Sequence, residues 1–198
     1  MFINIYSQKH TRVAATEWIL QNIPHGSTIA LEHWDDGMPL TGGENYQHIE
    51  LTLYDQPDDE KKWAILNEKL RQADYIIIAS NRLYVPLQKL SDCNPEPEQV
   101  RFRVIPYRPP WVVWYRDKKY KSCYPKTAEY YRKLFSNSLV IPSERSESRN
   151  LFKKVAEFSA YPRLCFMFQV SCFTINDQTA DESFTVYDHP KIIIFQKF

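Results

Sequence analysis

A short β-branched run near the middle of the chain constrains the fold more than any other stretch. Residues Asp74–Tyr84 have the sequence DYIIIASNRLY, with three consecutive isoleucines. An uninterrupted apolar run of this length is typical of a strand that is buried on both faces of a sheet. An ionic segment with helical periodicity precedes the run, and a polar corner follows it. We therefore expect an α/β domain organised around this strand.

The chain before this run alternates between helical and strand patterns. Thr11 to Ile23 and Glu60 to Gln72 each place apolar side chains on one helical stripe, and Thr28 to Glu32 is a short apolar run typical of a strand. His48 to Tyr54 alternates between apolar and polar residues, which favours a strand near the edge of a sheet. Units of helix and strand in this order imply right-handed crossovers and parallel strands.

The sequence after the isoleucine run does not continue the alternation of helix and strand. Tyr84 to Leu90 is expected to leave the sheet as a loop. Further helices are predicted over Thr127 to Leu139 and Asn150 to Ala160, a strand over Leu164 to Ile175, and a closing β-hairpin from Ser183 to Tyr187 and Lys191 to Lys197. The predicted fold is therefore a small open mixed sheet, with parallel core strands and a C-terminal antiparallel hairpin, flanked by about four helices.

Composition narrows the class of protein. With 198 residues, 43% of them hydrophobic, the chain suits one domain over residues 1–198. The net charge of +1 argues against a nucleic-acid partner, because such proteins usually carry a basic excess or stripe. No apolar run approaches the roughly 20 residues that cross a bilayer. The first ten residues lack the apolar core of a signal peptide, so we expect the chain itself to be soluble.

Polar side chains follow two of the predicted strands, and they form the candidate site. Open α/β sheets bind ligands beyond the carboxyl ends of their strands. The candidate substrate-binding residues are Glu32, His33, Asp35, Asp36, Asn81 and Arg82. These carboxylates and the imidazole could bind a cation or perform acid–base chemistry, or they could form a polar loop with a capped turn and Trp34 packed against the protein. Arg82 could pair with Asp35 or Asp36, or hold a phosphate or carboxylate of a ligand.

Other sites of chemistry have little support in the sequence. The four cysteines form no CxxC pair and the chain has only four glycines, so we expect no metal site, no phosphate-binding loop and no cofactor. Cys93 and Cys123 flank a proline-rich segment and could staple its base by a disulfide. Cys165 and Cys172 are interpreted as small core residues. His189, which precedes a proline at a turn, is interpreted as structural.

The segment from Ser91 to Tyr124 differs from the rest of the chain because its prolines break any long helix. Its alternating stretches predict a two-stranded excursion on the edge of the domain. The side chains of Trp111, Trp114 and Tyr115 could form an exposed contact surface or cover their own hairpin. Ile141 to Arg149 is polar and is predicted to be an exposed loop.

Several short blocks, taken in order, resemble a known family. They are His10–Ala15 with Trp18 and Ile19, Glu32–Asp36 with Met38–Leu40, Ala73–Tyr84, Tyr124–Thr127 with Tyr130, Tyr131, Leu134 and Phe135, Val155–Pro162, and Ser183–Phe195. This ordered set resembles the C-terminal soluble region of bacterial polytopic membrane glycosyltransferases of the GT-C type. Those enzymes are relatives of protein mannosyltransferases and lipid-A aminoarabinose transferases. Two stretches depart from the family pattern and are interpreted as insertions, 94–117 and 140–149.

The resemblance implies a role without chemistry. In such enzymes the catalytic acidic residue and the lipid-phosphate site belong to the membrane-embedded part, so this chain is expected to have no catalytic residues. The implied domain lies on the extracytoplasmic face, packs on the membrane part, and shapes access for a glycan acceptor or a polyprenyl-phosphate sugar. A disulfide between Cys93 and Cys123 fits that compartment. A free-standing small enzyme that uses the acidic residues, and an interaction module that uses Trp111, Trp114 and Tyr115, are the alternative hypotheses.

Overall fold

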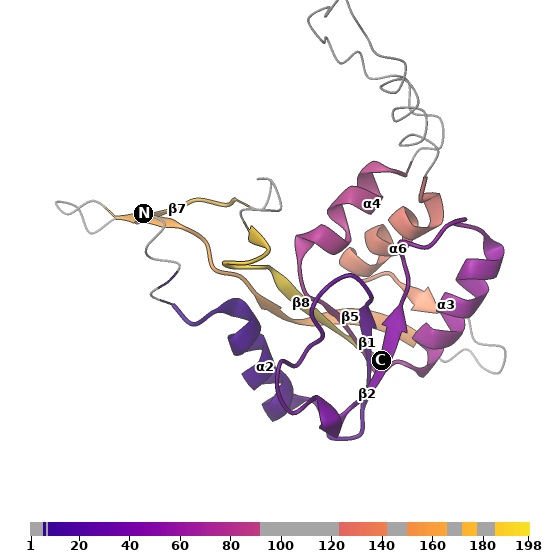
Figure 1. The fold of residues 1–198 in the computed structure, drawn as a ribbon, viewed down its shortest axis with the longest axis horizontal. Coiled ribbons are helices and arrows are strands. Elements are labelled where there is room, and N and C mark those ends of the chain that lie inside the picture. The colour runs from indigo at the N-terminus through magenta and orange to yellow at the C-terminus, as the bar shows by residue number, and fades with distance from the viewer. Residues whose placement is uncertain (1–5, 7, 92–122, 142–149, 166–171, 178–184) are drawn as a thin grey trace, which may run out of the picture.

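The computed structural model of the chain describes residues 6, 8–91, 123–141, 150–165, 172–177 and 185–198. Six strands form one mixed open sheet in the order β2-β1-β3-β8-β5-β4, and two further strands, β6 and β7, pair with each other (Figure 1). Four α-helices flank the sheet. The predicted fold class, an open mixed α/β sheet with about four helices, is therefore confirmed.

The bounds of the elements follow. The strands of the large sheet are β1 (Thr28–Glu32), β2 (Gln47–Leu51), β3 (Tyr75–Ile78), β4 (Val140–Ile141), β5 (Asn150–Phe158) and β8 (Ile192–Lys197), and the separate pair is β6 (Arg163–Cys165) and β7 (Cys172–Thr174). The helices are α2 (Thr11–Asn22), α3 (Glu60–Gln72), α4 (Val85–Lys89) and α6 (Pro125–Phe135), with short 3-10 turns η1 (Gly43–Asn45) and η2 (Asn81–Leu83).

The parallel part of the sheet is centred on β1. Ala30 of β1 pairs with Ile49 of β2 on one side and with Ile76 of β3 on the other, both in parallel register. Helix α3 carries the chain from β2 to β3, so β1 lies between the two strands that this crossover joins. The carboxyl ends of β1 and β3 consequently meet at the same edge of the sheet.

Strand β3 is buried on both faces, as the isoleucine run predicts. Ile76 and Ile78 of β3 belong to a core that includes side chains of α3, α4 and α6, whereas Tyr75 and Ile77 belong to a second core with side chains of α2. Figure 1 shows α2 on one side of the sheet and the other three helices on the opposite side. The alternation arises because successive side chains of a strand point to opposite faces.

Local sequence signals account for helix α3. Its N-cap residue Asp59 accepts a hydrogen bond from the Lys62 backbone N–H at 3.0 Å, which satisfies one of the free donors of the first turn. Trp63, Leu66 and Leu70 form its buried stripe. The cap and the stripe together define both ends, and the predicted bounds of this helix are confirmed.

The predicted helix over Asn150 to Ala160 is wrong, because residues 150–158 form strand β5. The register of β5 against β8 shifts between Lys154 and Ala156, which is a β-bulge. The bulge inserts one residue, so Phe152 packs into one core whereas Ala156 and Phe158 pack against the other. A period-2 pattern broken in this way resembles helical spacing, which explains the error.

Three predictions near the C-terminus also need correction. Residues 185–189 form a turn, in which the His189 N–H donates to the Thr185 carbonyl at 3.1 Å, so Thr185 to Tyr187 are not a hairpin strand. The antiparallel partners of β8 are β3 and β5 instead. The predicted strand from Leu164 to Ile175 is represented by the pair β6 and β7, and residues 166–171 between them lie outside the described residues.

Smaller differences affect the middle of the chain. Tyr84 to Leu90 contains the short helix α4 and is not a loop. Helix α6 ends at Phe135, before a residue with positive φ, Asn137, and the chain then enters β4. Ile141 is buried in β4 and is not part of an exposed loop.

Several predictions concern residues that the structure does not describe. The insertion 94–117, residues 142–149, and Trp111, Trp114 and Tyr115 all lie outside the described residues. In the part of the chain that is described, no helix is both long enough and apolar enough to cross a membrane.

Candidate functional site at the carboxyl ends of the parallel strands

The residues predicted for the site come from two loops that lie in contact. The loop after β1 carries Asp35, and the segment after β3 begins with Ser80, whose hydroxyl donates a hydrogen bond to Asp35 Oδ2. This contact follows from the parallel pairing of β1 and β3, which brings both loops to one edge of the sheet. The name site edge is used below for His33–Asp36 and Ser80–Arg82.

The carboxylates of the site edge are paired with an arginine that the sequence prediction did not include. Arg12, in the first turn of α2, donates from Nη2 to Asp35 Oδ1 at 2.7 Å and from Nη1 to Asp36 Oδ2. The side chains of Arg12 and Asp35 are only 11% and 5% exposed. The predicted pairing of Arg82 with these aspartates is therefore wrong, because Arg12 occupies that position.

Asp35 has little capacity left for a ligand. Its Oδ1 also accepts from the Asp36 backbone N–H at 2.8 Å, and its Oδ2 accepts from Ser80. A buried carboxylate with a cationic partner and hydrogen bonds on both oxygens is a structural link rather than a free acid–base group. This link joins α2 to the ends of β1 and β3.

Glu32, at the end of β1, lies beneath the site edge. Glu32 is 6% exposed. The Tyr131 hydroxyl of α6 lies 2.6 Å from Glu32 Oε2. Burial raises the pKa of Glu32 to about 8, the hydrogen bond with Tyr131 opposes the rise, and the negative charge of Asp35 adds to it. The raised pKa favours the neutral acid form of Glu32.

The outward side of the site edge is aromatic. Trp34 is 52% exposed, so the alternative in which it packs down into the protein is wrong. Its ring lies edge-on to the rings of His33 and Tyr54, with centroids 5.2 Å and 6.0 Å away. His33 in turn pairs with the Glu50 carboxylate of the neighbouring strand β2.

Arg82 lies next to this aromatic group. The Tyr54 hydroxyl donates to the Arg82 carbonyl at 2.8 Å. Arg82 is half-buried as a residue, and its side chain forms no ion pair with the residues that the structure describes. Tyr54 thus contacts both the Trp34 ring and the Arg82 backbone, and these three residues are called the aromatic–arginine surface below.

Asn81 and His189 have structural positions. Asn81 is buried and its Oδ1 accepts from the Thr185 hydroxyl at 3.2 Å, which ties the end of β3 to the turn before β8. His189 is 1% exposed, and its Nε2 lies 2.8 Å from Asp177 Oδ2. These contacts support the interpretation of His189 as a structural residue.

The structural role of a further buried carboxylate, Asp58, was not predicted from the sequence. Its side chain is 2% exposed and accepts from the backbone N–H groups of Lys126 and Thr127 in the first turn of α6, at 2.8 Å and 3.0 Å. Its remaining donors are Thr127 Oγ1, Trp63 Nε1 and Lys62 Nζ. Asp58 therefore joins α3 to α6.

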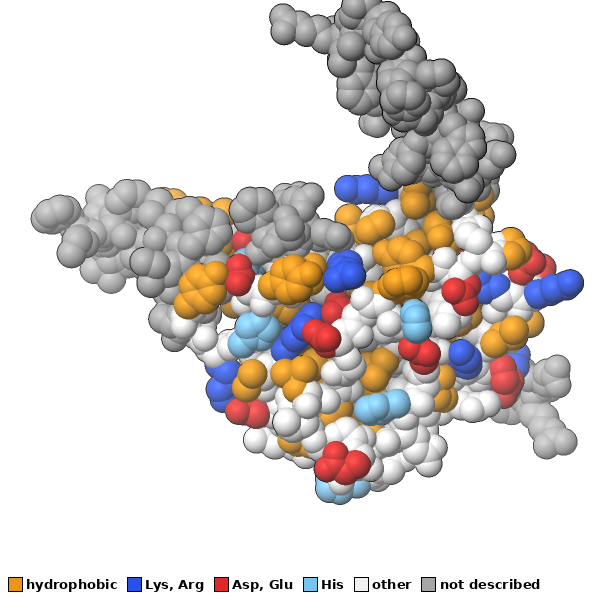
Figure 2. Space-filling view, viewed as in Figure 1, with side chains coloured by type: hydrophobic (Ala, Val, Ile, Leu, Met, Phe, Trp, Pro, Cys, Tyr) orange, Lys and Arg blue, Asp and Glu red, His pale blue; other side chains and the backbone are white. Residues whose placement is uncertain are grey.

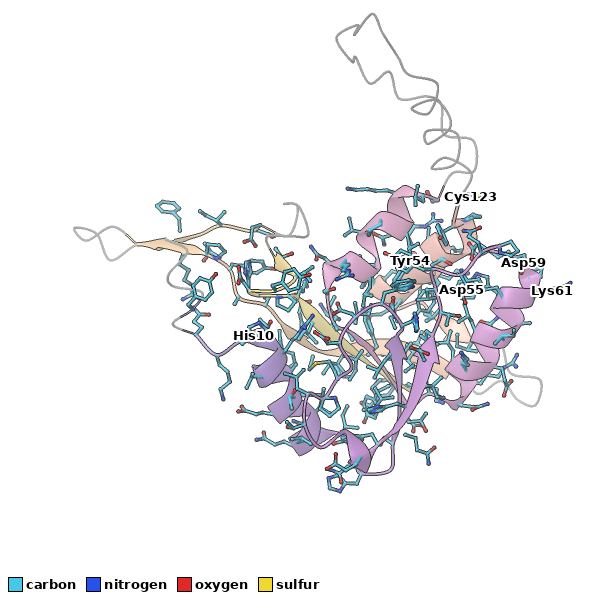
Figure 3. The ribbon with its side chains drawn as sticks, viewed as in Figure 1. His10, Tyr54, Asp55, Asp59, Lys61 and Cys123 are labelled. Atoms are coloured by element: carbon cyan, nitrogen blue, oxygen red, sulfur yellow. The ribbon has the colours of Figure 1, made fainter. Side chains whose placement is uncertain are left out.

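Cys123 also lies on this side of the molecule, away from His10 at the start of α2 (Figure 3). Cys123 is disulfide-bonded, and its carbonyl accepts from Gln56 Nε2 at 2.9 Å. Cys93, its predicted partner, lies outside the described residues. The side chains of Cys165 and Cys172, interpreted as core residues from the sequence, also lie outside the description.

The surface charge is mixed. Figure 2 shows acidic, basic, histidine and hydrophobic side chains intermingled over the coloured part of the face that it presents. Within the described ranges, no group of three or more His, Cys, Asp or Glu side chains has an arrangement that could hold a metal ion.

No protein-family model, no curated protein and no solved structure matches this chain. The family resemblance of the sequence blocks therefore stays a prediction.

Proposed function

We propose that this chain is a non-catalytic, extracytoplasmic domain of a membrane glycosyltransferase of the GT-C type, and that its site edge shapes access for an acceptor or a sugar phosphate. The ordered sequence blocks support the family assignment. The observation that carries the non-catalytic role is that Arg12 binds Asp35 Oδ1 and Asp36 Oδ2 while the Ser80 hydroxyl binds Asp35 Oδ2, so that both oxygens of Asp35 are engaged. Carboxylates held in this way favour a structural role over metal binding or proton transfer.

The compartment is supported by Cys123. A structural disulfide forms and persists in oxidising environments and is rare in the cytosol. The disulfide at Cys123 therefore favours the extracytoplasmic side of the membrane.

The aromatic–arginine surface is the proposed contact for a sugar phosphate. The half-exposed indole of Trp34 offers an apolar plane, and the guanidinium of Arg82 offers paired donors that match a phosphate. Tyr54 connects the two residues, since its ring lies against Trp34 and its hydroxyl binds the Arg82 carbonyl.

Two measurements test the proposal. The purified chain, incubated with a polyprenyl-phosphate sugar and a glycan acceptor, is expected to transfer no sugar, and transfer by the chain alone would overturn the non-catalytic role. In-frame hydrophobic spans encoded upstream of Met1 would support membership of a larger membrane enzyme, and a stop codon immediately upstream would contradict it.

The contact surface has its own test. Nuclear magnetic resonance titration of the full chain with a soluble short-chain prenyl-phosphate sugar should shift signals of residues around Trp34 and Arg82. Trp34→Ala and Arg82→Ala should each weaken binding about tenfold. Ile65→Ala is the matched control, because Ile65 is an exposed apolar side chain on α3. Equal binding by all three variants would exclude this surface as the contact.

A further inference from the structure

Glu32 and Tyr131 meet in the interior although 99 residues separate them in the chain. Glu32 ends β1, and Tyr131 lies in the middle of α6 with no exposed surface. The Tyr131 oxygen lies 2.6 Å from Glu32 Oε2 and 3.1 Å from the carbonyl oxygen of Leu83 in η2. A single hydroxyl therefore links β1, α6 and η2 directly beneath the site edge.

The count of protons assigns the state of this group. A tyrosine hydroxyl has one proton to donate, and both of its neighbours, a carboxylate oxygen and a carbonyl oxygen, would act as acceptors if Glu32 were ionised. With Glu32 ionised, the Tyr131 O–H donates to Glu32 Oε2. A neutral Glu32 can reverse this hydrogen bond by donating its own proton from Oε2 to Tyr131, which leaves the Tyr131 O–H for the Leu83 carbonyl. Both hydrogen bonds are then complete, each with its own proton.

The surroundings also disfavour the ionised form. Glu32 Oε1 is buried and has no hydrogen-bond partner among the described residues. A buried carboxylate with one oxygen that lacks a donor is costly to ionise, which favours uptake of a proton.

Among the described residues, the titratable groups that act on this site add no cation for Glu32. Asp35 follows in the next loop and is negative, Tyr130 and Tyr131 of α6 are neutral, and Tyr54 acts on Tyr131 from the loop after β2. The positive charge of Arg12 on α2 is engaged by Asp35.

We propose that Glu32 is a proton-operated latch, which fastens α6 and η2 to the end of β1 while it is neutral and loosens them when it ionises. The latch does not depend on the glycosyltransferase proposal. It adds a property of the same region, namely that the contacts of Tyr131 with Glu32 and Leu83 respond to pH.

The expected pH dependence has a definite sign. The folded-state pKa of Glu32 is about 8 and its ordinary value is 4.5, so between these values the folded chain holds a proton that the unfolded chain has released. Rising pH therefore favours unfolding, and the Glu32 contribution to the unfolding equilibrium constant increases about tenfold per pH unit across this window. Below pH 4.5 and above pH 8 the contribution is constant.

The first experiment compares urea unfolding of the full chain between about pH 5 and pH 9 for the wild type, Glu32→Gln and Glu44→Gln. The glutamine amide mimics the neutral acid but cannot ionise, so the ratio of unfolding constants, wild type over Glu32→Gln, should rise by on the order of a thousandfold across the window. Glu44 is exposed, so Glu44→Gln should follow the wild type. A ratio that does not change with pH would overturn the latch.

The second experiment needs no variant and therefore remains decisive if Glu32→Gln does not fold. Infrared spectra of the wild type with carbon-13 glutamate should show, at pH 6, the carbonyl band of a protonated carboxylic acid, and the band should disappear above about pH 9. Amide hydrogen exchange in α6 should accelerate over the same range. Absence of the acid band at pH 6 would show that Glu32 is ionised and would refute the proposal.

Discussion

Replacing Asp58 by alanine should strongly destabilise the chain, because this one side chain connects two helices in the interior. The carboxylate is 2% exposed and accepts hydrogen bonds from Lys62, Trp63 and residues 126–127. Its removal leaves the Lys62 ammonium, which is 8% exposed, without its counter-ion. Two backbone N–H groups of the first turn of α6 also lose their acceptor.

The magnitude follows from two effects that share the same contacts. Removing one partner of a buried ion pair costs about 3–5 kcal/mol, and losing the acceptor at a helix N-terminus costs about 0.5–2 kcal/mol. Lys62 keeps hydrogen bonds to the Leu53 carbonyl and to Thr127 Oγ1, at 2.7 Å and 3.1 Å, which reduces the penalty. We therefore expect a loss of about 3 kcal/mol for Asp58→Ala.

Urea denaturation of a double-mutant cycle measures this loss. Asp58→Ala, Lys62→Met and the double variant are compared, and the double variant should recover part of the stability because no unpaired ammonium remains. Asp55→Ala is the control, since Asp55 is exposed. A loss below about 1 kcal/mol for Asp58→Ala, the range of surface ion pairs, would refute the reasoning.

Asp58 should also make the stability of the folded chain sensitive to acid. Burial acts to raise the pKa of Asp58, but hydrogen bonds from Thr127, Trp63 and Lys62 outweigh it and hold the pKa below its ordinary value of 3.8. The stability that Asp58 contributes is therefore present above pH 3.8 and is lost as the pH falls through the lower folded-state pKa. Asp58→Ala should consequently be less sensitive to acid than the wild type. Parallel acid titrations of the two proteins would contradict this assignment.

Three further substitutions test other parts of the structure by urea unfolding. Arg12→Met should cost about 2–4 kcal/mol, because it leaves the buried Asp35 carboxylate without a cation, and a loss near zero would contradict the Arg12 link. Gly42→Ala should cost about 1–2 kcal/mol, since Gly42 has a φ of 73° and an added Cβ would lie 2.8 Å from Leu20 Cδ2; Gly37→Ala is the matched control. Phe152→Ala should cost about 3–5 kcal/mol, because Phe152 is fully buried in the core, whereas a loss near zero would place its side chain outside the core.

Much of the local structure was determined by the sequence alone. The isoleucine run of β3 predicted a strand buried on both faces, and the cap and stripe of α3 defined that helix. The order of helices and strands predicted parallel strands, and Asn81 and Arg82 were expected beside His33–Asp36 on the condition that β1 and β3 are parallel neighbours. The structure meets that condition. These features follow from side-chain periodicity and from capping, which act over a few neighbouring residues.

The tertiary structure alone decided the partners of the charged groups and the path of β5. The β-bulge gives the side chains of β5 a spacing that resembles that of a helix, because one extra residue is accommodated in the pairing with β8. Arg12 rather than Arg82 reached Asp35, and Tyr131 reached Glu32 across 99 residues. Such choices depend on which side chains the packed helices bring together in a water-poor interior, where an unpaired charge is costly. No spacing along the chain encodes that proximity.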